Sequence, residues 1–446
     1  MKRLALTLII SAAVLTGCGG GEEGGARTAD GKVLLRYGLW DTNQKPVYQK
    51  CADKFQQANP NIQVQIENKN WGDYWSGLAR GFIAETAPDV FTDHLGKYPQ
   101  FAQSEVIEPV STRAVNMDQY LPGLAKLWES PSGKQYGFPK DWDTVALIVN
   151  EDMLGKAGVT KQQLDSATWN PSDGGTFEQI VAKLTVDNNG KRGDQPGFDK
   201  SNVKTYGLAF DPGGLTYGQT TWAGFAASLG FKLLNKNPWG TQYNYDDPRF
   251  AQTFTWWRNM IQKGYMPSLE QARTLGQSAA FQSGRAALAI DGDWTISTYS
   301  GTKGIKVGYA PQPAGPQGSW SMYNGLADAI WVGTKHKPEA VKWVRFLGSP
   351  ACQSIVGNAA VVFPAIKSEV PKAVAAHKKQ GVDVSAYTSY IKSGNTVLYP
   401  ITDKAPQINL IVQPTLEEFL NGTKPASEVF PKMNDQVNAQ LEYSTQ

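Results

Sequence analysis

The feature that most restricts the fold of this chain is an alternation of strand and helix signals in its first hundred residues. Residues 33–39 are rich in apolar side chains, and residues 62–66 (IQVQI) alternate between apolar and polar ones, as expected for strands. Apolar residues at helical spacing lie over 44–58 and 71–85, and a short strand over 89–91 follows. This β-α-β-α-β order predicts an open, mostly parallel α/β sheet.

Polar and aromatic side chains stand where these strands end. Trp40 and Asp41 follow the first strand, and Asp93 and His94 follow the third. In open α/β sheets, ligands bind beyond the carboxyl ends of the strands. The alternation alone therefore predicts part of a binding site at this edge.

A second region, residues 136–150 (YGFPKDWDTVALIVN), is expected to connect two lobes. The chain has 446 residues, whereas single hydrophobic cores stop growing at about 250–300 residues. Residues 145–149 form an unbroken apolar run, typical of a strand buried on both faces. The polar, turn-rich stretch before it is expected to place Trp142 and Asp143 at the edge of a cleft. An ordinary loop is the alternative interpretation of the same residues.

The rest of the chain continues the α/β pattern before becoming largely helical beyond about residue 370. Further strands are expected over residues 205–210, 286–290, 305–309 and 327–332. Residues 187–202 have the composition of a calcium loop, but Lys191 and Arg192 fall among the would-be ligands and no bidentate Glu follows. We therefore favour a solvated loop there.

The side chains at the predicted strand ends and loops share a chemistry that suits a sugar. Carboxylates and amides form directional hydrogen bonds with hydroxyl groups, and aromatic faces cover the apolar face of a sugar ring. The candidate ligand-binding residues are Trp40, Asp41, Trp71, Asp93, Trp142, Asp143, Trp222, Gly292, Trp294, Tyr323 and Asn324. Each Trp could instead pack in a core, and Asp291 and Asp293 could cap the helix that starts near Trp294.

Common catalytic motifs are missing from the sequence. It holds no G-x-S-x-G, H-E-x-x-H, Walker A or C-x-x-C, and its three histidines are His94, His336 and His377. We therefore expect no catalytic residues, no metal site and no cofactor. A secreted glycoside hydrolase remains an alternative from another class, because its two carboxylates carry no sequence signature.

The N-terminus reads as a lipoprotein export signal. Lys2 and Arg3 precede an apolar stretch over residues 4–15 that is too short to span a bilayer, and Leu15-Thr16-Gly17-Cys18 matches a lipobox. We expect cleavage before Cys18, lipidation of that cysteine and a flexible tether over 19–25. The formal net charge of +3, two units of which lie in the removed segment, gives no support for nucleic-acid binding.

Two cysteines remain, Cys51 and Cys352. They could pair in an exported protein. Because they are far apart in sequence and fall in different predicted helices, we expect two buried free thiols instead.

An ordered set of motifs resembles the extracellular solute-binding proteins of bacterial ABC importers, in the sugar-binding cluster that includes maltose-binding protein. These motifs are Trp40-Asp41 after the first strand, a helix ending in Thr86-Ala87-Pro88-Asp89-Val90, Tyr136-Gly137-Phe138-Pro139 with Trp142-Asp143-Thr144, Gly292-Asp293-Trp294, and Phe363-Pro364-Ala365. The chain departs from the family pattern at Asn324-Gly325, where many members have Gly-Gly, and at Ile83-Ala84-Glu85, where many have Ala-Ala-Gly.

The resemblance implies two α/β lobes, each a mostly parallel sheet flanked by helices, with a ligand cleft between them. It implies a signal peptide over 1–17, a lipidated tether over 18–30, a first lobe of 31–142 with about 304–330, a second of 143–303 with about 331–400, and helices over 401–446 packing across both. It assigns ligand roles to Asp93, Asp143 and Trp294. The implied protein is a non-enzymatic monomer, exported and anchored by lipid to the cell membrane, which hands a mono- or oligosaccharide to an ABC permease; polyamine or glycerophosphate are alternative ligands.

Overall fold

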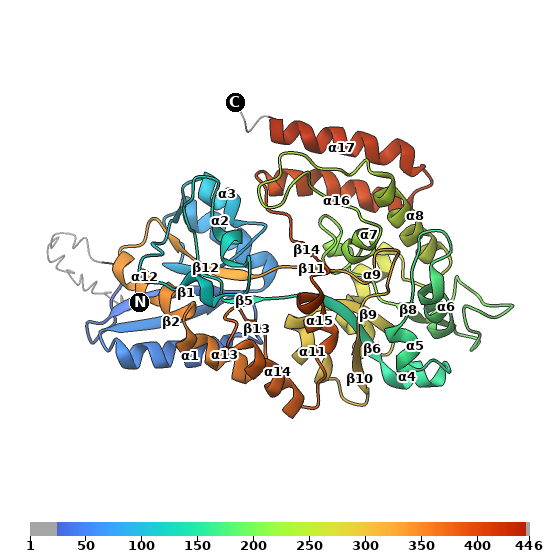
Figure 1. The fold of residues 1–446 in the computed structure, drawn as a ribbon, viewed down its shortest axis with the longest axis horizontal. Helices are drawn as coiled ribbons and strands as arrows, with labels where there is room; N and C mark the ends of the chain where they lie inside the picture. The colour runs from blue at the N-terminus through green and yellow to red at the C-terminus, as the bar shows by residue number, and fades with distance from the viewer. Residues whose placement is uncertain (1–24, 443–446) are drawn as a thin grey trace, which may run out of the picture.

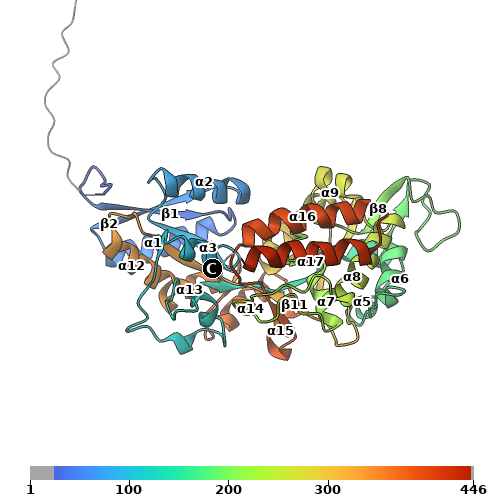
Figure 2. The ribbon, with the colours of Figure 1, turned by 90° about the horizontal axis from the view of Figure 1, so that it is seen from above.

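The computed structural model describes residues 25–442, which form two α/β lobes connected by crossing segments (Figures 1 and 2). Cys18 and the signal segment lie outside the described residues. None of the helices between residues 25 and 442 combines the length and apolar character that a membrane span requires.

The first lobe is built on a five-stranded sheet in the order β2-β1-β3-β12-β4. β1 pairs in parallel with β2 and β3, whereas β12 runs antiparallel to β3 and β4. The strands are β1 (Val33–Leu39), β2 (Ile62–Asn68), β3 (Val90–His94), β4 (Ile107–Glu108) and β12 (Leu326–Trp331). The helices of this lobe are α1 (Lys45–Ala58), α2 (Trp71–Ile83), α3 (Tyr98–Gln103), η1 (Met117–Gln119), η2 (Ala125–Trp128), α12 (Lys337–Leu347), α13 (Pro350–Ala359) and α14 (Val370–Lys379). The parallel arrangement expected from the sequence is present in β2, β1 and β3, and the antiparallel β12 makes the rest of the sheet mixed.

The second lobe also holds a five-stranded sheet, in the order β10-β6-β9-β8-β7. Its strands are β6 (Val145–Asn150), β7 (Val186–Asp187), β8 (Val203–Leu208), β9 (Ala286–Gly292) and β10 (Val307–Ala310). Only β8 and β9 pair in parallel, so this sheet is mixed. The expectation of a mostly parallel sheet fails here because β6 enters from the other lobe and runs antiparallel to both of its neighbours.

Helices surround the second sheet, with α16 and α17 forming an outer layer against α8 (Figure 1). The helices of this lobe are α4 (Glu151–Lys156), α5 (Lys161–Asp165), α6 (Gly175–Leu184), η3 (Pro212–Gly214), α7 (Ala223–Ser228), α8 (Pro248–Gln262), α9 (Leu269–Leu275), α10 (Gln277–Gln282), η4 (Asp293–Thr295), α11 (Ile296–Ser300), α16 (Ala405–Asn421) and α17 (Ala426–Glu442). In the loop over 187–202, the Asp187 carboxylate accepts hydrogen bonds from the backbone N–H groups of Asn189, Lys191 and Asp199. The acidic composition of that loop thus serves the loop's own backbone.

Two short ladders mark the crossing segments. β5 (Asp141–Trp142) pairs with β13 (Phe363–Pro364), and β11 (Ser321–Tyr323) pairs with β14 (Thr396–Leu398). The remaining helix, α15 (Ser385–Ser393), lies beside β6 near the junction (Figure 1).

The lobe boundaries differ from those expected. β10 belongs to the second sheet rather than to the first lobe, so the predicted 304–330 segment divides between the lobes. Helices α12, α13 and α14, which we placed in the second lobe, pack on the first. Trp343 shows why, because its ring lies edge-on to both Tyr37 and Phe55 in the first core, 5.5 and 5.1 Å away.

The C-terminal helices also differ from the expectation that they bridge both lobes. α16 and α17 lie side by side over the second lobe (Figures 1 and 2) and pack against α8. The rings of Phe419 and Phe430, 4.7 Å apart, complete a cluster with Phe254. The apolar faces of α16 and α17 are therefore buried within the second lobe.

Cys51 and Cys352 form a disulfide, which corrects the expectation of free thiols. They do lie in different helices, α1 and α13, but these helices pack together and bring the two Cα atoms to 5.2 Å. A spacing of 5.2 Å falls in the normal range for a disulfide. The bond joins residues 301 positions apart in sequence and lies entirely in the first lobe.

Candidate binding site between the lobes

A cleft of about 970 Å³ lies between the lobes and is lined by residues of both lobes and of the crossing segments. This volume is at the upper end of the usual range for small-molecule sites. The lining residues come from the ends of β1 and β3, from β5, from the loop after β8, and from the start of α16.

The first-lobe wall is aromatic. Trp40 follows β1, and its ring lies edge-on to Trp71 at the start of α2, with 5.1 Å between centroids. Trp71 is 48% exposed, unusually open for a tryptophan, and its ring also contacts Trp75 at 5.3 Å and His94 at 5.6 Å. Since β1 and β3 are parallel neighbours, their carboxyl ends bring Trp40 and His94 to the same edge of the sheet.

Asp41 also faces the cleft, but its carboxylate is already engaged. It accepts hydrogen bonds from the backbone N–H groups of Asn43 and Gln44 and from the side-chain amide of Gln44. It therefore fixes the turn that leads into α1.

His94 is neutral in the first-lobe wall. Burial, with a smaller effect from Lys97, lowers its pKa to about 3. Its Nδ1 accepts the N–H of Gly96, and its Nε2 lies 2.9 Å from the side-chain amide of Asn324. The ring thus orients Asn324 at the floor of the cleft.

The crossing segment supplies three further lining residues, Asp141, Trp142 and Asp143. Trp142 is only 1% exposed because its ring stacks on Phe363 at 4.7 Å, where β5 pairs with β13. Asp143 accepts a 2.7 Å hydrogen bond from the side-chain amide of Gln219. Its backbone N–H and C=O pair with those of Asn324 at 2.9 and 3.2 Å, which holds the two crossing strands together.

Asp293 lies beside this segment, just after β9. Its Oδ2 accepts the N–H of Thr144 at 3.1 Å, and its own N–H donates to the Thr144 carbonyl. Burial raises the pKa of Asp141 to about 7. Burial, with added repulsion from Asp141, raises the pKa of Asp143 well above its usual range, and burial with repulsion from Asp143 does the same for Asp293. These three carboxyls therefore hold protons more tightly than exposed ones.

Trp294 completes the second-lobe side of the cleft. Its ring lies directly against Gly292, where an added Cβ would come within 1.8 Å of ring atoms. Gly292 does not line the cleft, but only glycine permits this position of the indole.

Seven of the residues predicted from the sequence line the cleft: Trp40, Asp41, Trp71, Trp142, Asp143, Trp294 and Asn324. Four do not. Gly292 lies behind Trp294, and Tyr323 is buried in β11 beside Trp142.

Asp93 and Trp222 lie away from the cleft for simple reasons. Side chains alternate along a strand, so Asp93 points into the first lobe while His94 faces the cleft. Trp222 packs in the second core, 5.0 Å from the ring of Phe250, and donates its indole N–H to the carbonyl of Leu215.

Sequence reasoning missed most of the second-lobe wall. Asp211, Gln219 and Thr220 lie in the loop that follows β8. Applying the strand-end rule to β8 would have found Asp211. Tyr399 and Asn409 reach the cleft from the C-terminal part of the chain, where no local pattern marks them.

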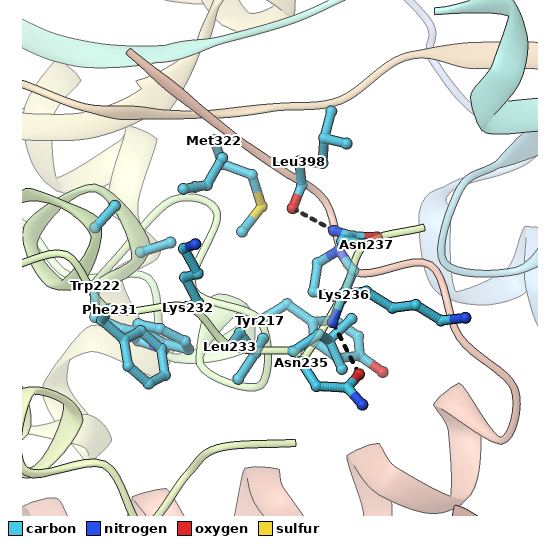
Figure 3. Close-up of a pocket in the computed structure, with 15 residues that line it drawn as sticks. Tyr217, Trp222, Phe231, Lys232, Leu233, Asn235, Lys236, Asn237, Met322 and Leu398 are labelled. Atoms are coloured by element: carbon cyan, nitrogen blue, oxygen red, sulfur yellow. Dashed lines mark hydrogen bonds between the residues drawn. The ribbon is translucent and has the colours of Figure 1, made fainter. Parts of the chain in front are cut away.

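A second, smaller cavity of about 300 Å³ adjoins the cleft, and Tyr217 lines both. Figure 3 shows Trp222, Phe231 and Lys232 on one side and Met322 and Leu398 on another. The Asn237 side chain donates to the Leu398 carbonyl at 3.0 Å and closes one end.

Comparisons with known proteins match this architecture. Residues 50–381 fit the family model of the bacterial extracellular solute-binding proteins. The maltodextrin-binding protein MdxE of Bacillus subtilis (strain 168) is 26% identical over 376 residues, which cover 82% of this chain and 79% of the relative.

Two solved structures share the fold. An ABC substrate-binding protein of Listeria monocytogenes, in complex with cycloalternan, superposes with a TM-score of 0.77 at 19% identity, covering 92% of this chain and 99% of that one. The GacH receptor of Streptomyces glaucescens, solved unliganded and with acarbose, gives a TM-score of 0.74 at 18% identity, with coverage of 92% and 99%.

Proposed function

The chain belongs to the bacterial extracellular solute-binding proteins, and from this premise we propose that it captures a sugar in the interlobe cleft and delivers it to an ABC import permease. The main observation in favour of a sugar ligand is that aromatic faces and hydrogen-bonding groups line the same cleft. Trp40, Trp71 and Trp294 offer surfaces for the C–H faces of sugar rings, and Asp143 and Asn324 offer acceptors and donors for hydroxyl groups.

Closure of the lobes provides the mechanism. A ligand that contacts Trp71 on one lobe and Trp294 on the other is bound best when both walls surround it, so it shifts an open–closed equilibrium towards the closed form. The closed form is the one that would dock on the permease.

We propose that the protein does not catalyse a reaction on its ligand. A glycoside hydrolase needs two carboxyl groups on either side of the scissile bond. Asp41 and Asp211, which face the cleft from different lobes, use their carboxylates to cap local turns. The other carboxyl groups that line the cleft, those of Asp141, Asp143 and Asp293, lie on or beside the crossing segment and not on opposite walls.

The N-terminal sequence supports a lipid anchor at Cys18, exposed to the cell exterior or periplasm. Cys18→Ser should move the protein from the membrane fraction to the soluble fraction after cell breakage. Retention of this variant in the membrane fraction would argue against the anchor.

The ligand class is tested by a thermal-shift screen of the purified protein against neutral and amino sugars, polyamines and glycerophosphates. A ligand at 100 times its dissociation constant adds about 2.7 kcal/mol to the free energy of unfolding. Stabilisation by sugars, with no new product on chromatography, is the expected result. A response to glycerophosphate or polyamine alone, or release of sugar from a glycoside, would overturn the proposal.

A further inference from the structure

Three carboxyl groups that line the cleft lie near enough to one another to interact electrostatically. Asp141 and Asp143 flank Trp142 on the crossing segment, and two hydrogen bonds join Asp293 to Thr144 of the same segment. All three residues line the cleft, yet their exposed fractions are only 3%, 8% and 1%.

Part of their hydrogen-bonding capacity is unused. Asp141 accepts the N–H of Leu326 through Oδ1, but its Oδ2 has no partner. Asp293 Oδ1 also has none. Asp143 receives one bond, from Gln219, so its second oxygen is available as well. Buried acceptors without donors are costly, and a bound ligand can supply the missing donors.

Within the described part of the chain, the three carboxyl groups also lack a cationic partner at ion-pair distance. None of the ion pairs in residues 25–442 includes these three carboxylates. Lys140 is their neighbour in sequence, but its ammonium group turns into the first lobe. It lies 3.5 Å from Asp328 there and 4.0 Å from the ring centroid of Tyr48.

Lys97 lines the cleft on its first-lobe side. Its ammonium group lies 5.5 Å from the ring centroid of Trp75. Burial raises the pKa of Asp141 and the charge of Lys140 partly opposes that rise, but neither lysine forms an ion pair with one of the three carboxylates.

Burying unpaired like charges is unfavourable, so such groups keep protons or take a cation. The raised pKa values of Asp141, Asp143 and Asp293 show the first response in the unliganded protein. A ligand with hydroxyl groups alone would form hydrogen bonds with these carboxyl groups but would not stabilise their charged form. A ligand with an ammonium group would supply donors and the missing charge together.

We propose that the cleft is selective for a sugar that carries a protonated amino group, held by the cluster of Asp141, Asp143 and Asp293. This inference rests on the proposed sugar-binding function and narrows its ligand class. Trp294 stands next to Asp293, and an indole face attracts a cation in addition to covering a ring.

The aromatic walls favour a sugar ring over a linear polyamine, since Trp40, Trp71 and Trp294 present flat surfaces on two lobes. A metal ion fits less well. Among residues 25–442, no group of three or more His, Cys, Asp or Glu side chains is arranged to hold one.

The test compares sugars that differ only in an amino or hydroxyl group. Glucosamine is paired with glucose, and the β-1,4-linked glucosamine disaccharide with cellobiose, by titration calorimetry of the full chain at pH 7. We expect the amino member to bind at least tenfold more tightly in at least one pair.

Variants connect this preference to the cluster. Asp143→Asn should reduce the ratio of the two affinities to less than about threefold, and Asp293→Asn serves the same purpose if the first variant folds poorly. Asp165→Asn, which removes one negative charge from the exposed surface of α5, is the matched control and should keep the ratio.

The outcomes separate the two proposals. Equal or tighter binding of the neutral sugar of each pair overturns the amino-sugar inference and leaves sugar binding in place. A preference for the amino sugar that persists in both Asp143→Asn and Asp293→Asn has the same consequence. Binding of spermidine or of Ca²⁺ with no response to any sugar overturns both.

Discussion

The indole N–H of Trp239 donates a 3.0 Å hydrogen bond to the backbone carbonyl of Glu129, and this contact joins a loop of the second lobe to the first. The Trp239 ring also lies edge-on to Tyr98 of the first lobe, 5.8 Å between centroids. Trp239 adopts a positive φ of 62°, which a bulky residue takes only when its surroundings hold it there. The contact is therefore a specific link that favours the relative orientation of the lobes seen here.

Trp239→Phe should loosen this link while keeping an aromatic ring. A single hydrogen bond contributes about 1 kcal/mol, so sugar affinity should fall by up to about fivefold. The radius of gyration of the unliganded protein, measured by small-angle scattering, should increase. An unchanged radius together with unchanged affinity would show that the contact does not restrain the lobes.

Two tryptophans predicted as ligand contacts should behave differently when truncated. Trp294→Ala should weaken sugar binding by about 1–3 kcal/mol with little change in the melting temperature of the free protein, because its ring faces the cleft. Trp222→Ala should instead lower the stability by about 3–5 kcal/mol, since its ring is 1% exposed in the second core. Calorimetric titration and thermal unfolding of both variants would distinguish them, and an unaltered affinity for Trp294→Ala would remove that residue from the site.

The disulfide should contribute measurably to stability. It closes a loop of 301 positions, and disulfides commonly contribute about 2–5 kcal/mol by restricting the unfolded chain. Cys51→Ala/Cys352→Ala should therefore unfold at a lower urea concentration than the oxidised parent. Added reductant should lower the urea midpoint of the parent but not that of the double variant. An unchanged midpoint of the parent with reductant would contradict the expectation.

Stability should fall as the pH rises from about 4 to 7. The pKa of Asp141 is raised from 3.8 to about 7 by burial, so its neutral form is favoured in the folded protein. Between pH 3.8 and about pH 7, the folded state therefore binds more protons than the unfolded state. The stability present at low pH is lost as the pH rises through about 7. Asp291, whose pKa is raised to about 6, acts in the same direction.

Asp141→Asn should reduce this pH dependence. Asn keeps an oxygen for the N–H of Leu326 but carries no charge at any pH. The difference in melting temperature between pH 5 and pH 8, without ligand, should be smaller than in the parent. Asp165→Asn is the control and should match the parent, whereas an unchanged difference in Asp141→Asn would show that other groups dominate.

Local pattern was sufficient to predict the strand ends that build the site. Trp40 and Trp142 were identified because strand alternation and strand–helix order depend on neighbouring residues. The lobe assignment of α12 was wrong for the opposite reason. An amphipathic stripe shows that a helix packs on something, but only the tertiary structure shows that Trp343 packs between Tyr37 and Phe55.

The same limit explains the remaining errors. The pairing of Cys51 with Cys352 depends on two helices meeting across most of the chain, which no local signal encodes. Trp222 and Trp294 each lie at the start of a helix, yet the first is core and the second faces the cleft. The contribution of Gln219 to Asp143 likewise arises from a contact between distant segments.

The position of β12 between β3 and β4 determines when the first lobe can be completed. The chain is synthesised from its N-terminus, so β4 cannot pair with β12 until residue 331 has been made. The disulfide likewise cannot form until Cys352 has been made. Every strand of the second sheet is made during that interval. The first sheet of a nascent chain therefore stays unfinished for most of its synthesis. For the same reason, a fragment that ends at residue 142 should not fold into a working half.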